Sequence, residues 1–194
     1  CVQNVKDDGF DCIFTLGGDS TQKSVRDFSL RGINVIGVPK TIDNDVACTD
    51  VTFGFNTAVS VATEALDRLH TTAETHNRIM VLEVMGRYAG WITLESAIAG
   101  GADVALLPEI PYDIDKVVEK IQARQKAGKN FSVVVVSEGA FPKGGSISVK
   151  DTREGGKGVI NIQLGGAGDI VAKELERRTG LISRNTTLGY LQRG

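Results

Sequence analysis

The amino-acid sequence predicts an α/β fold built on a mostly parallel sheet. Short apolar, β-branched runs recur along the 194 residues, and stretches with helical periodicity separate them. This alternation of strand and helix is typical of parallel sheets with crossover helices. The strand-like runs are also almost continuously apolar, which indicates that the sheet is covered on both faces.

Six apolar runs are predicted to be strands: Cys12 to Leu16, Ile33 to Val38, Ile79 to Val84, Val104 to Leu107, Val133 to Val136 and Thr186 to Leu191. Four stretches are predicted to be helices: Gln22 to Leu30, Phe55 to Leu69, Ile114 to Ile121 with Gly128 as a stop, and Asp169 to Arg178. The glycine-dense stretch from Gly144 to Gly168 predicts a loop or hairpin. Trp91, Phe53 and Phe55 are expected in the core.

Composition points to a globular protein and names no partner. The chain is 41% hydrophobic and 24% charged, and its formal net charge of -2 gives no attraction to nucleic acid or anionic membranes. Cys1, Cys12 and Cys48 are three in number and widely spaced, which argues against metal clusters and a disulfide framework and predicts a cytoplasmic location. No apolar run approaches the roughly 18 residues of a membrane span. Because the chain begins with Cys1 and not Met, we expect a fragment.

The first candidate site is the segment Leu16-Gly17-Gly18-Asp19-Ser20-Thr21, which joins a predicted strand to a predicted helix. Glycines let backbone N–H groups approach a phosphate closely, and a helix N-terminus adds positive potential. Asp19 could hold Mg²⁺ against bound phosphates. The alternative is a tight turn in which Asp19 only caps the helix.

The second candidate site is the loop Pro39-Lys40-Thr41-Ile42-Asp43-Asn44-Asp45, which also follows a buried strand. In open α/β sheets ligands bind outside the carboxyl ends of the strands, so this loop and the double-glycine turn are predicted to face one site. One carboxylate can accept the proton of an attacking hydroxyl group while a second steadies metal or water. The alternative is a surface turn rich in Asp and Asn.

Two arginines flank the predicted strand Ile79 to Val84. Arg78 precedes the strand, and Met85-Gly86-Arg87 follows it, while Glu138 follows the strand Val133 to Val136. The planar guanidinium group suits phosphate oxygens, and Glu138 could accept hydrogen bonds from sugar hydroxyl groups. Taken singly, each arginine also fits a solvated surface charge.

The last candidate segment combines Arg184 with the run Leu188-Gly189-Tyr190-Leu191-Gln192-Arg193-Gly194. It again places cations near the end of a predicted strand. A sugar bisphosphate needs several cations, because its charge must be neutralised in a partly dry cleft. The alternative is an exposed loop arginine.

Taken together, these segments closely resemble the phosphofructokinase family. Members of that family carry, in this order, a GGDG(S/T) turn, a (G/K)TIDND loop, an MGR segment, a glutamate after a strand and a QRG segment. The matching residues here are Gly17 to Thr21, Lys40 to Asp45, Met85 to Arg87, Ser137 to Glu138 and Gln192 to Gly194. The likeness also includes Gly54 to Leu69, Arg87 to Gly90 and Leu106 to Glu109, so it covers most of the chain.

The resemblance implies Mg²⁺-dependent phosphoryl transfer to the 1-hydroxyl group of fructose 6-phosphate, a step of glycolysis. It implies that Asp43 is the general base, that Asp19 and Asp45 serve the metal, and that Thr41 and Arg87 contact the transferring group. The implied sugar-phosphate contacts are Thr41, Ile42, Asp43, Arg78, Met85, Gly86, Arg87, Glu138, Arg184, Tyr190 and Arg193. The implied donor contacts are Gly18, Asp19, Ser20, Thr21 and Lys40.

The resemblance also implies two mostly parallel α/β domains that face each other across a cleft. Residues 1–54 would form part of the phosphoryl-donor domain, residues 55–191 the sugar-phosphate domain, and residues 192–194 a return toward the donor domain. Family members carry an earlier donor-binding strand and further chain after the QRG segment, so the donor site is expected to be incomplete. Arginines at the positions of Arg78 and Arg184 come from a neighbouring subunit in the family, which implies a homo-oligomer.

Two positions bear on the phosphoryl donor. Ser20 stands where ATP-using members have glycine and many pyrophosphate-using members have aspartate. Lys40 is expected in pyrophosphate enzymes, although a separate ATP-using branch also carries it. Because a neutral serine does not repel the α-phosphate as an aspartate would, we expect ATP as the donor, with pyrophosphate as the alternative.

The effector site of allosteric bacterial members is altered at two of the four positions that match it. His70 stands in place of an arginine and Ala127 in place of a basic residue, while Asp103 and Lys129 are retained. This pattern argues against regulation by the usual nucleotide.

Two other functions use related sequences. One is a lipid or NAD kinase with a similar glycine turn, against which the TIDND, MGR and QRG segments argue. The other is a non-catalytic sugar-phosphate or nucleotide sensor. The retained Asp19, Asp43 and Asp45 argue against a sensor, because binding alone needs no base.

Overall fold

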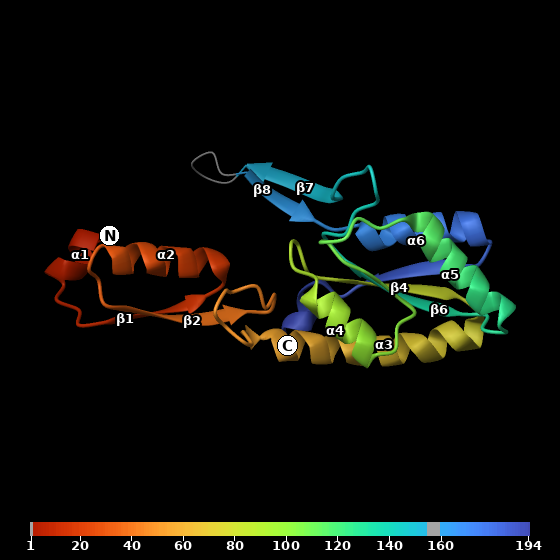
Figure 1. Ribbon diagram of the computed structural model, residues 1–194, viewed down its shortest axis with the longest axis horizontal. Coiled ribbons are helices and arrows are strands. Elements are labelled where there is room, and N and C mark those ends of the chain that lie inside the picture. Colours follow the sequence, from red (N-terminus) through yellow and green to blue (C-terminus); the bar gives the residue numbers. More distant parts are fainter. Residues whose placement is uncertain (1, 155–159) are drawn as a thin grey trace. The chain divides into compact units, whose positions relative to one another are not determined.

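The computed structural model describes residues 2–154 and 160–194. The chain divides into two compact units, Cys1–Asn56 and Thr57–Gly194. Each unit carries its own parallel sheet, and helices connect strands of each sheet along the chain (Figure 1). The predicted α/β class is therefore confirmed.

The first unit holds a three-stranded sheet with one helix packed along it. Its elements are α1 (Val2–Asp7), β1 (Ile13–Gly17), α2 (Asp19–Leu30), β2 (Val35–Thr41) and β3 (Phe53–Gly54). The strands lie in the order β1-β2-β3 and all pairs are parallel. The side chain of Gln22 in α2 donates from Nε2 to the carbonyl oxygens of Gly17 and Val38, both at 3.0 Å. The start of the helix is thus tied to the ends of both long strands.

One face of this small sheet is open to solvent. Phe14 and Leu16 are each 64% exposed, and Ile36, which pairs with Phe14 across the sheet, is 47% exposed. The expectation that every strand is covered on both faces is therefore wrong for the first unit, because no described layer packs on these side chains. Phe53, which was expected in the core, is also exposed.

The second unit has a four-stranded sheet that is covered on both sides. Its strands are β4 (Ile79–Val84), β5 (Val104–Leu106), β6 (Ser132–Ser137) and β9 (Ser183–Thr187), in the parallel order β5-β6-β4-β9. Figure 1 shows α5 (Ile114–Lys126) and α6 (Ala167–Thr179) on one face, and α3 (Phe55–His76) and α4 (Trp91–Ala99) on the other. Every residue of β4 and β6 is buried, as the continuous apolar runs predicted.

The core of the second unit follows from strand alternation. On one face, Val81 and Val134 pack with Val117 of α5 and Val171 of α6 in a single buried cluster. Alternate residues of the same strands point to the opposite face. The central strands are therefore fixed in position, and so are the loops that leave their carboxyl ends.

Several boundaries differ from the sequence prediction. β9 ends at Thr187, and the 3-10 helix η2 (Gly189–Arg193) replaces the second half of the predicted strand Thr186 to Leu191. α4 was not predicted, because its apolar residues are spread around the helix and give no one-sided stripe. Trp91 at its start is 46% exposed and not core, whereas Phe55 is buried as expected.

The glycine-dense stretch contains a hairpin. β7 (Val149–Glu154) and β8 (Ile160–Leu164) pair antiparallel, which agrees with the prediction of a loop or hairpin over Gly144 to Gly168. Residues 155–159 of that stretch lie outside the described residues.

Cys12 and Cys48 are free thiols. In the part of the chain that the structure describes, no helix has the length and apolar character that crossing a membrane requires.

Candidate active site

In the first unit, the double-glycine turn and the loop Thr41 to Asp45 lie against each other. Gly17 pairs with Pro39 across the sheet, so both segments leave it at the same edge. A Cβ atom on Gly18 would lie 3.3 Å from Cβ of Thr41, which shows direct contact between turn and loop. The two segments therefore converge as the sequence predicts.

The conformation of this loop fixes the carboxylate of Asp43. The Thr41 hydroxyl group donates to Oδ2 of Asp43 at 3.0 Å and accepts the Asp43 backbone N–H at 3.2 Å. Asn44 adopts a left-handed backbone conformation, and its side-chain oxygen accepts the Thr52 N–H at 3.0 Å. Sequence reasoning assigned Asn44 no role. Asparagine tolerates the left-handed region, which most residues avoid, so the presence of Asn44 in the loop was the signal in the sequence for this turn.

Three carboxylates concentrate negative charge at this edge. Burial raises the pKa of Asp45 above its ordinary value, and the charges of Asp43 and Asp19 raise it further. Oδ2 of Asp19 lies 2.6 Å from Nζ of Lys23, and this hydrogen bond raises the pKa of the Lys23 ammonium group. Repulsion between the carboxylates would be relieved by a bound cation.

These carboxylates suit Mg²⁺ as part of its coordination shell. Among the described residues, no group of three acidic, histidine or cysteine side chains is arranged to hold a metal alone. Mg²⁺ does not need such a group, since it usually binds one or two carboxylates together with water and substrate phosphates. A metal ion held by carboxylates at this edge would therefore also need water or phosphate ligands.

The N-terminus of α2 is open toward this site. Gly18 is the N-cap residue, and no side-chain cap hydrogen bond is made there. The alternative in which Asp19 caps the helix is thus not observed. The first N–H groups of an α-helix have no partner within the helix, so they can bind an anion. Ser20 and Lys40 are exposed at this edge, while Thr21 packs over Gly17.

In the second unit, the Met85-Gly86-Arg87 segment is bound to the end of β6. The Ser137 hydroxyl group donates to the Gly86 carbonyl oxygen at 2.7 Å, and the Gly139 N–H donates to the same oxygen at 3.1 Å. Gly86 has a φ of 144°, and a Cβ atom there would lie 2.4 Å from Oγ of Ser137. Only glycine fits this position. Glu138 follows directly, with its N–H bonded to the Val84 carbonyl oxygen at 2.9 Å.

The helix η2 approaches the same segment from β9. The Met85 N–H donates to Oε1 of Gln192 at 3.1 Å. Tyr190 is 72% exposed, and the Arg193 guanidinium group stacks 4.8 Å from the centre of its ring. Met85, Gly86, Arg87, Glu138, Tyr190 and Arg193 are therefore all presented at the carboxyl edge of the second sheet.

Arg87 has an unused hydrogen-bond donor. Its Nε atom is buried and has no hydrogen-bond partner in the part of the chain that the structure describes, and its guanidinium group lies 5.1 Å from the centre of the Tyr88 ring. A buried donor without a partner is costly unless a ligand oxygen satisfies it. This favours an anionic ligand beside Arg87.

Arg78 and Arg184 lie at the other edge of this sheet. Arg78 comes directly before β4, and Arg184 pairs with Met80 near the amino end of β9. At roughly 3.3 Å per residue along β4, the level of Arg78 lies about 23 Å from Met85, and that of Arg184, which pairs with Met80, lies about 17 Å from it. The structure therefore does not bring these two arginines together with the other predicted site residues of the second unit.

Comparison with known proteins identifies the family. A family profile described as "Phosphofructokinase" matches residues 1–194. The chain belongs to the phosphofructokinase family. It is 59% identical to ATP-dependent 6-phosphofructokinase 2 of Clostridium perfringens, over 100% of this chain and 52% of that protein. It is 50% identical to ATP-dependent 6-phosphofructokinase 3 of Streptomyces coelicolor, over 98% of this chain and 55% of that protein.

Solved structures of phosphofructokinases share the fold. The T-state enzyme of Pichia pastoris matches with a TM-score of 0.82 and 29% identity, over 100% of this chain and 22% of that one. A pyrophosphate-dependent phosphofructokinase of Nitrosospira multiformis matches with a TM-score of 0.78 and 30% identity, over 99% of this chain and 48% of that one. The chain spans about half the length of the curated relatives that it matches.

The residues that match the effector site of allosteric phosphofructokinases have internal partners. Oδ1 of Asp103 lies 2.7 Å from Nη1 of Arg124, and its Oδ2 accepts the Val133 N–H at 2.9 Å. Nε2 of His70 lies 3.2 Å from the Gly101 carbonyl oxygen. Both oxygens of the Asp103 carboxylate are thus already paired within the chain.

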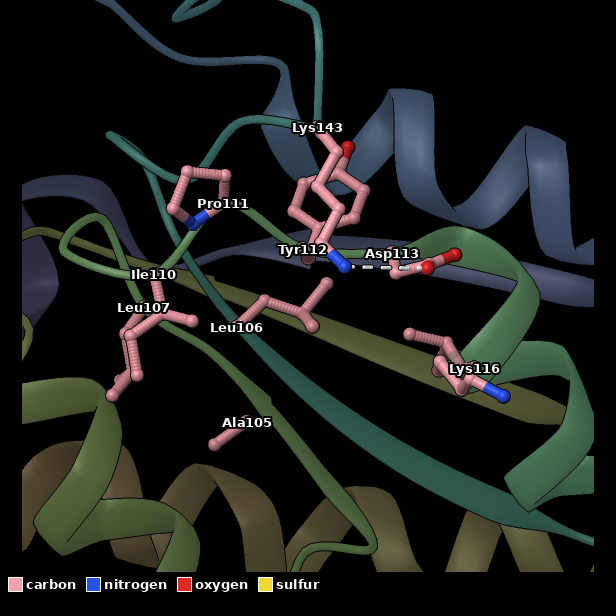
Figure 2. Close-up of a pocket in the computed structure, with 10 residues that line it drawn as sticks. Ala105, Leu106, Leu107, Ile110, Pro111, Tyr112, Asp113, Lys116 and Lys143 are labelled. Atoms are coloured by element: carbon pink, nitrogen blue, oxygen red, sulfur yellow. Dashed lines mark hydrogen bonds and ion pairs between the residues drawn. The ribbon is translucent and has the colours of Figure 1, made fainter.

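A pocket of about 330 Å³ lies beside β5 and the start of α5. Figure 2 shows Leu106, Ile110 and Tyr112 around it, with the ion pair of Lys143 and Asp113 at 3.4 Å on its rim. None of the predicted site residues of this phosphofructokinase chain lines it. We assign no ligand to it, because its two lysines are exposed and already paired with carboxylates.

Proposed function

We propose that this protein is a 6-phosphofructokinase that transfers a phosphoryl group from ATP to the 1-hydroxyl group of fructose 6-phosphate. The observation that carries the proposal is the contact between Gly18 and Thr41. It places an uncapped helix N-terminus, suited to phosphate, beside the Asp43 carboxylate, suited to a proton. Binding and proton removal are then available at one edge of the first unit.

The first unit would carry the donor chemistry. Asp43 accepts the proton of the sugar hydroxyl group, and the Thr41 hydroxyl group orients that carboxylate through its 3.0 Å hydrogen bond. Asp19 and Asp45 would hold Mg²⁺, which neutralises charge on the phosphates when bound. The backbone of Gly18 to Thr21 and the side chain of Lys40 would contact the donor.

The second unit would carry the sugar-phosphate chemistry. Met85, Gly86 and Glu138 would bind the sugar, together with Ile42 of the first unit. The open Nε donor of Arg87 would bind the transferring phosphoryl group. Tyr190 and Arg193 would bind the 6-phosphate from η2. The division into donor and sugar-phosphate domains near Gly54, with residues 192–194 returning toward the donor domain, is part of this proposal.

Arg78 and Arg184 would act in the site of a neighbouring subunit. They lie toward the amino edge of the sheet, about 17 to 23 Å from the carboxyl edge that presents the other contacts. This separation supports a role in the site of another subunit over a role in the site of their own chain. A homo-oligomer in a cytoplasmic setting is the form in which we expect the enzyme to work.

Pyrophosphate is the second candidate donor. Lys40 and the likeness to a pyrophosphate-dependent phosphofructokinase favour it. The relatives with about half or more of their residues identical are instead named ATP-dependent, and the neutral Ser20 leaves room for an α-phosphate. These two observations favour ATP. Measuring turnover with each donor decides between them.

The variant Asp43→Asn tests the proposed reaction. It removes the base while keeping the size of the side chain, so the rate is expected to fall by roughly 10²- to 10⁴-fold with little loss of fructose 6-phosphate binding. Asp50→Asn, at an exposed acidic residue of the same loop, is the matched control and should keep its rate. Normal turnover by the Asp43→Asn protein would overturn the proposal, as would a wild-type protein without kinase activity.

A further inference from the structure

Gln192 is buried between two segments that carry different parts of the proposed site. Its side chain has no exposure to solvent and is the buried residue of η2. Oε1 accepts the Met85 N–H at 3.1 Å, and Nε2 donates to the Gly189 carbonyl oxygen at 2.8 Å. Both ends of one amide are therefore used, one on each segment.

The two bonded segments bind different ends of the sugar in the proposed function. Met85 begins the segment that leads to Arg87, which would hold the transferring phosphoryl group. Gly189 begins the helix that carries Tyr190 and Arg193, which would hold the 6-phosphate. Among the described residues, no other side-chain hydrogen bond joins these two segments. The amide of Gln192 thus sets the spacing between them.

The helix η2 has little else to hold it. It is a single five-residue turn, and Tyr190 and Leu191 are 72% and 74% exposed. Backbone support at its entrance comes from the Leu188 N–H, which donates to the Glu83 carbonyl oxygen at 3.1 Å. After Leu188, the side chain of Gln192 holds η2 to the end of β4 through its hydrogen bond with the Met85 N–H.

We propose that Gln192 is a positioning residue for phosphoryl transfer, which fixes the 6-phosphate contacts relative to the segment that ends in Arg87. This inference rests on the proposed function. Transfer needs the 1-hydroxyl group to meet the donor in a defined geometry while the other end of the sugar is held. A displacement of about 1 Å can lower the rate roughly 10²-fold, so one buried amide is enough to matter.

The variant Gln192→Glu separates this role from plain structural support. The new carboxylate still accepts the Met85 N–H, but its second oxygen faces the Gly189 carbonyl oxygen without a hydrogen to donate. Ionised, it repels that carbonyl group and displaces η2. Protonated, it donates again, and burial raises the pKa of such a carboxyl group. Lowering the pH should therefore partly reverse the defect caused by Gln192→Glu.

Steady-state kinetics and binding of fructose 6-phosphate by Gln192→Glu test the proposal. At pH 8 we expect KM for fructose 6-phosphate to rise about tenfold or more and kcat to fall, with KM for the donor changed by less than about twofold. Near pH 6 the defect relative to wild type should shrink. If the variant does not fold, Gln192→Met, which fills a similar volume without hydrogen bonds, should show the same rise in KM without the pH dependence.

Ser96→Ala is the control for loss of a buried hydrogen bond. Ser96 is also fully buried, but its hydroxyl group bonds only within α4, to the Ile92 carbonyl oxygen at 2.6 Å. It should lower thermal stability without changing KM for the sugar. Wild-type sugar kinetics in both Gln192 variants, or equal defects at both pH values in Gln192→Glu, would overturn the positioning role. Inactive wild-type protein would instead contradict the proposed function, and sugar binding by the variants would then test Gln192 separately.

Discussion

Asp19, Asp43 and Asp45 place three negative charges around the end of β2, and among the described residues only Lys23 makes an ion pair with one of them. The raised pKa of Asp45 reflects partial burial and this repulsion. A donor phosphate can bind at such an edge only with a cation, because like charges a few ångströms apart cost free energy in a partly dry site. The site is thus sensitive to any further negative charge at the N-terminus of α2.

The variant Ser20→Asp tests this sensitivity. Ser20 is exposed in the uncapped first turn of α2, so an aspartate there should repel the donor and raise KM for ATP about tenfold or more. Ser29→Asp, at the exposed far end of the same helix, is the control and should leave KM for ATP unchanged. Unaltered ATP kinetics in Ser20→Asp would reject our account of position 20.

The residues that carry chemistry could be predicted because they stand at strand ends. Gly18, Asp43 and Gly86 each follow an apolar run, and parallel strands place such residues at one edge. Residues that work through long-range hydrogen bonds could not be predicted. Gln22 and Gln192 join segments far apart in the sequence, and a single amide leaves no periodic signal.

At the level of elements, α5 and α6 are joined by a charged network at the surface. Glu174 of α6 accepts hydrogen bonds from Arg177 and Arg178, and Arg178 also pairs with Asp115 of α5. The bond from Arg177, followed by that from Arg178, lowers the pKa of Glu174 from 4.5 to about 2. The folded state therefore favours the ionised carboxylate.

The pH dependence of stability should reflect this network. Because the folded pKa is depressed, the contribution of Glu174 is fully present above about pH 4.5 and is lost as the pH falls toward 2. Glu174→Gln should lower the melting temperature slightly at pH 7 and hardly at all near pH 2, since the group is exposed and screened. Thermal melts at both pH values check this, with Glu64→Gln on α3 as a control at another exposed ion pair. A larger loss in acid than at neutral pH would contradict it.

Strands with continuous apolar runs and helices with a one-sided apolar stripe were predictable, and β9 and α4 were not. β4 begins and ends where the sequence places it, because all six of its residues are buried. β9 was shifted because its residues, Ser183 to Thr187, are mostly polar and the apolar run lies in the exposed η2. α4 gave no signal because its apolar residues are spread around the helix, while the polar Thr93 and Ser96 are among its buried residues.

At the level of the whole molecule, the second sheet carries candidate site residues at both of its ends. The carboxyl edge of the second sheet presents Met85 and Glu138, while its amino edge carries Arg78 and Arg184. In a homo-oligomer, the amino edge of one subunit would complete the sugar-phosphate site of its neighbour. The catalytic unit would then be a pair of subunits.

Mixed oligomers test this arrangement. Arg184→Ala subunits lack the donated arginine, and Asp43→Asn subunits lack the base, so each homogeneous protein should be nearly inactive. After unfolding and refolding together, an intact Asp43 and an intact Arg184 should meet at some interfaces and restore a substantial fraction of the activity. Equal mixtures with no more activity than the separate variants would show that Arg184 serves its own chain or none. Wild-type protein taken through the same refolding is the control for recovery.

The uncovered strip of Phe14, Leu16 and Ile36 governs how the first unit behaves in water. A row of exposed apolar side chains is hydrated unfavourably. Such a surface tends to associate with other apolar surfaces. A preparation of these 194 residues would consequently tend to aggregate. Shielding that row with another protein layer would improve solubility before any ligand is added.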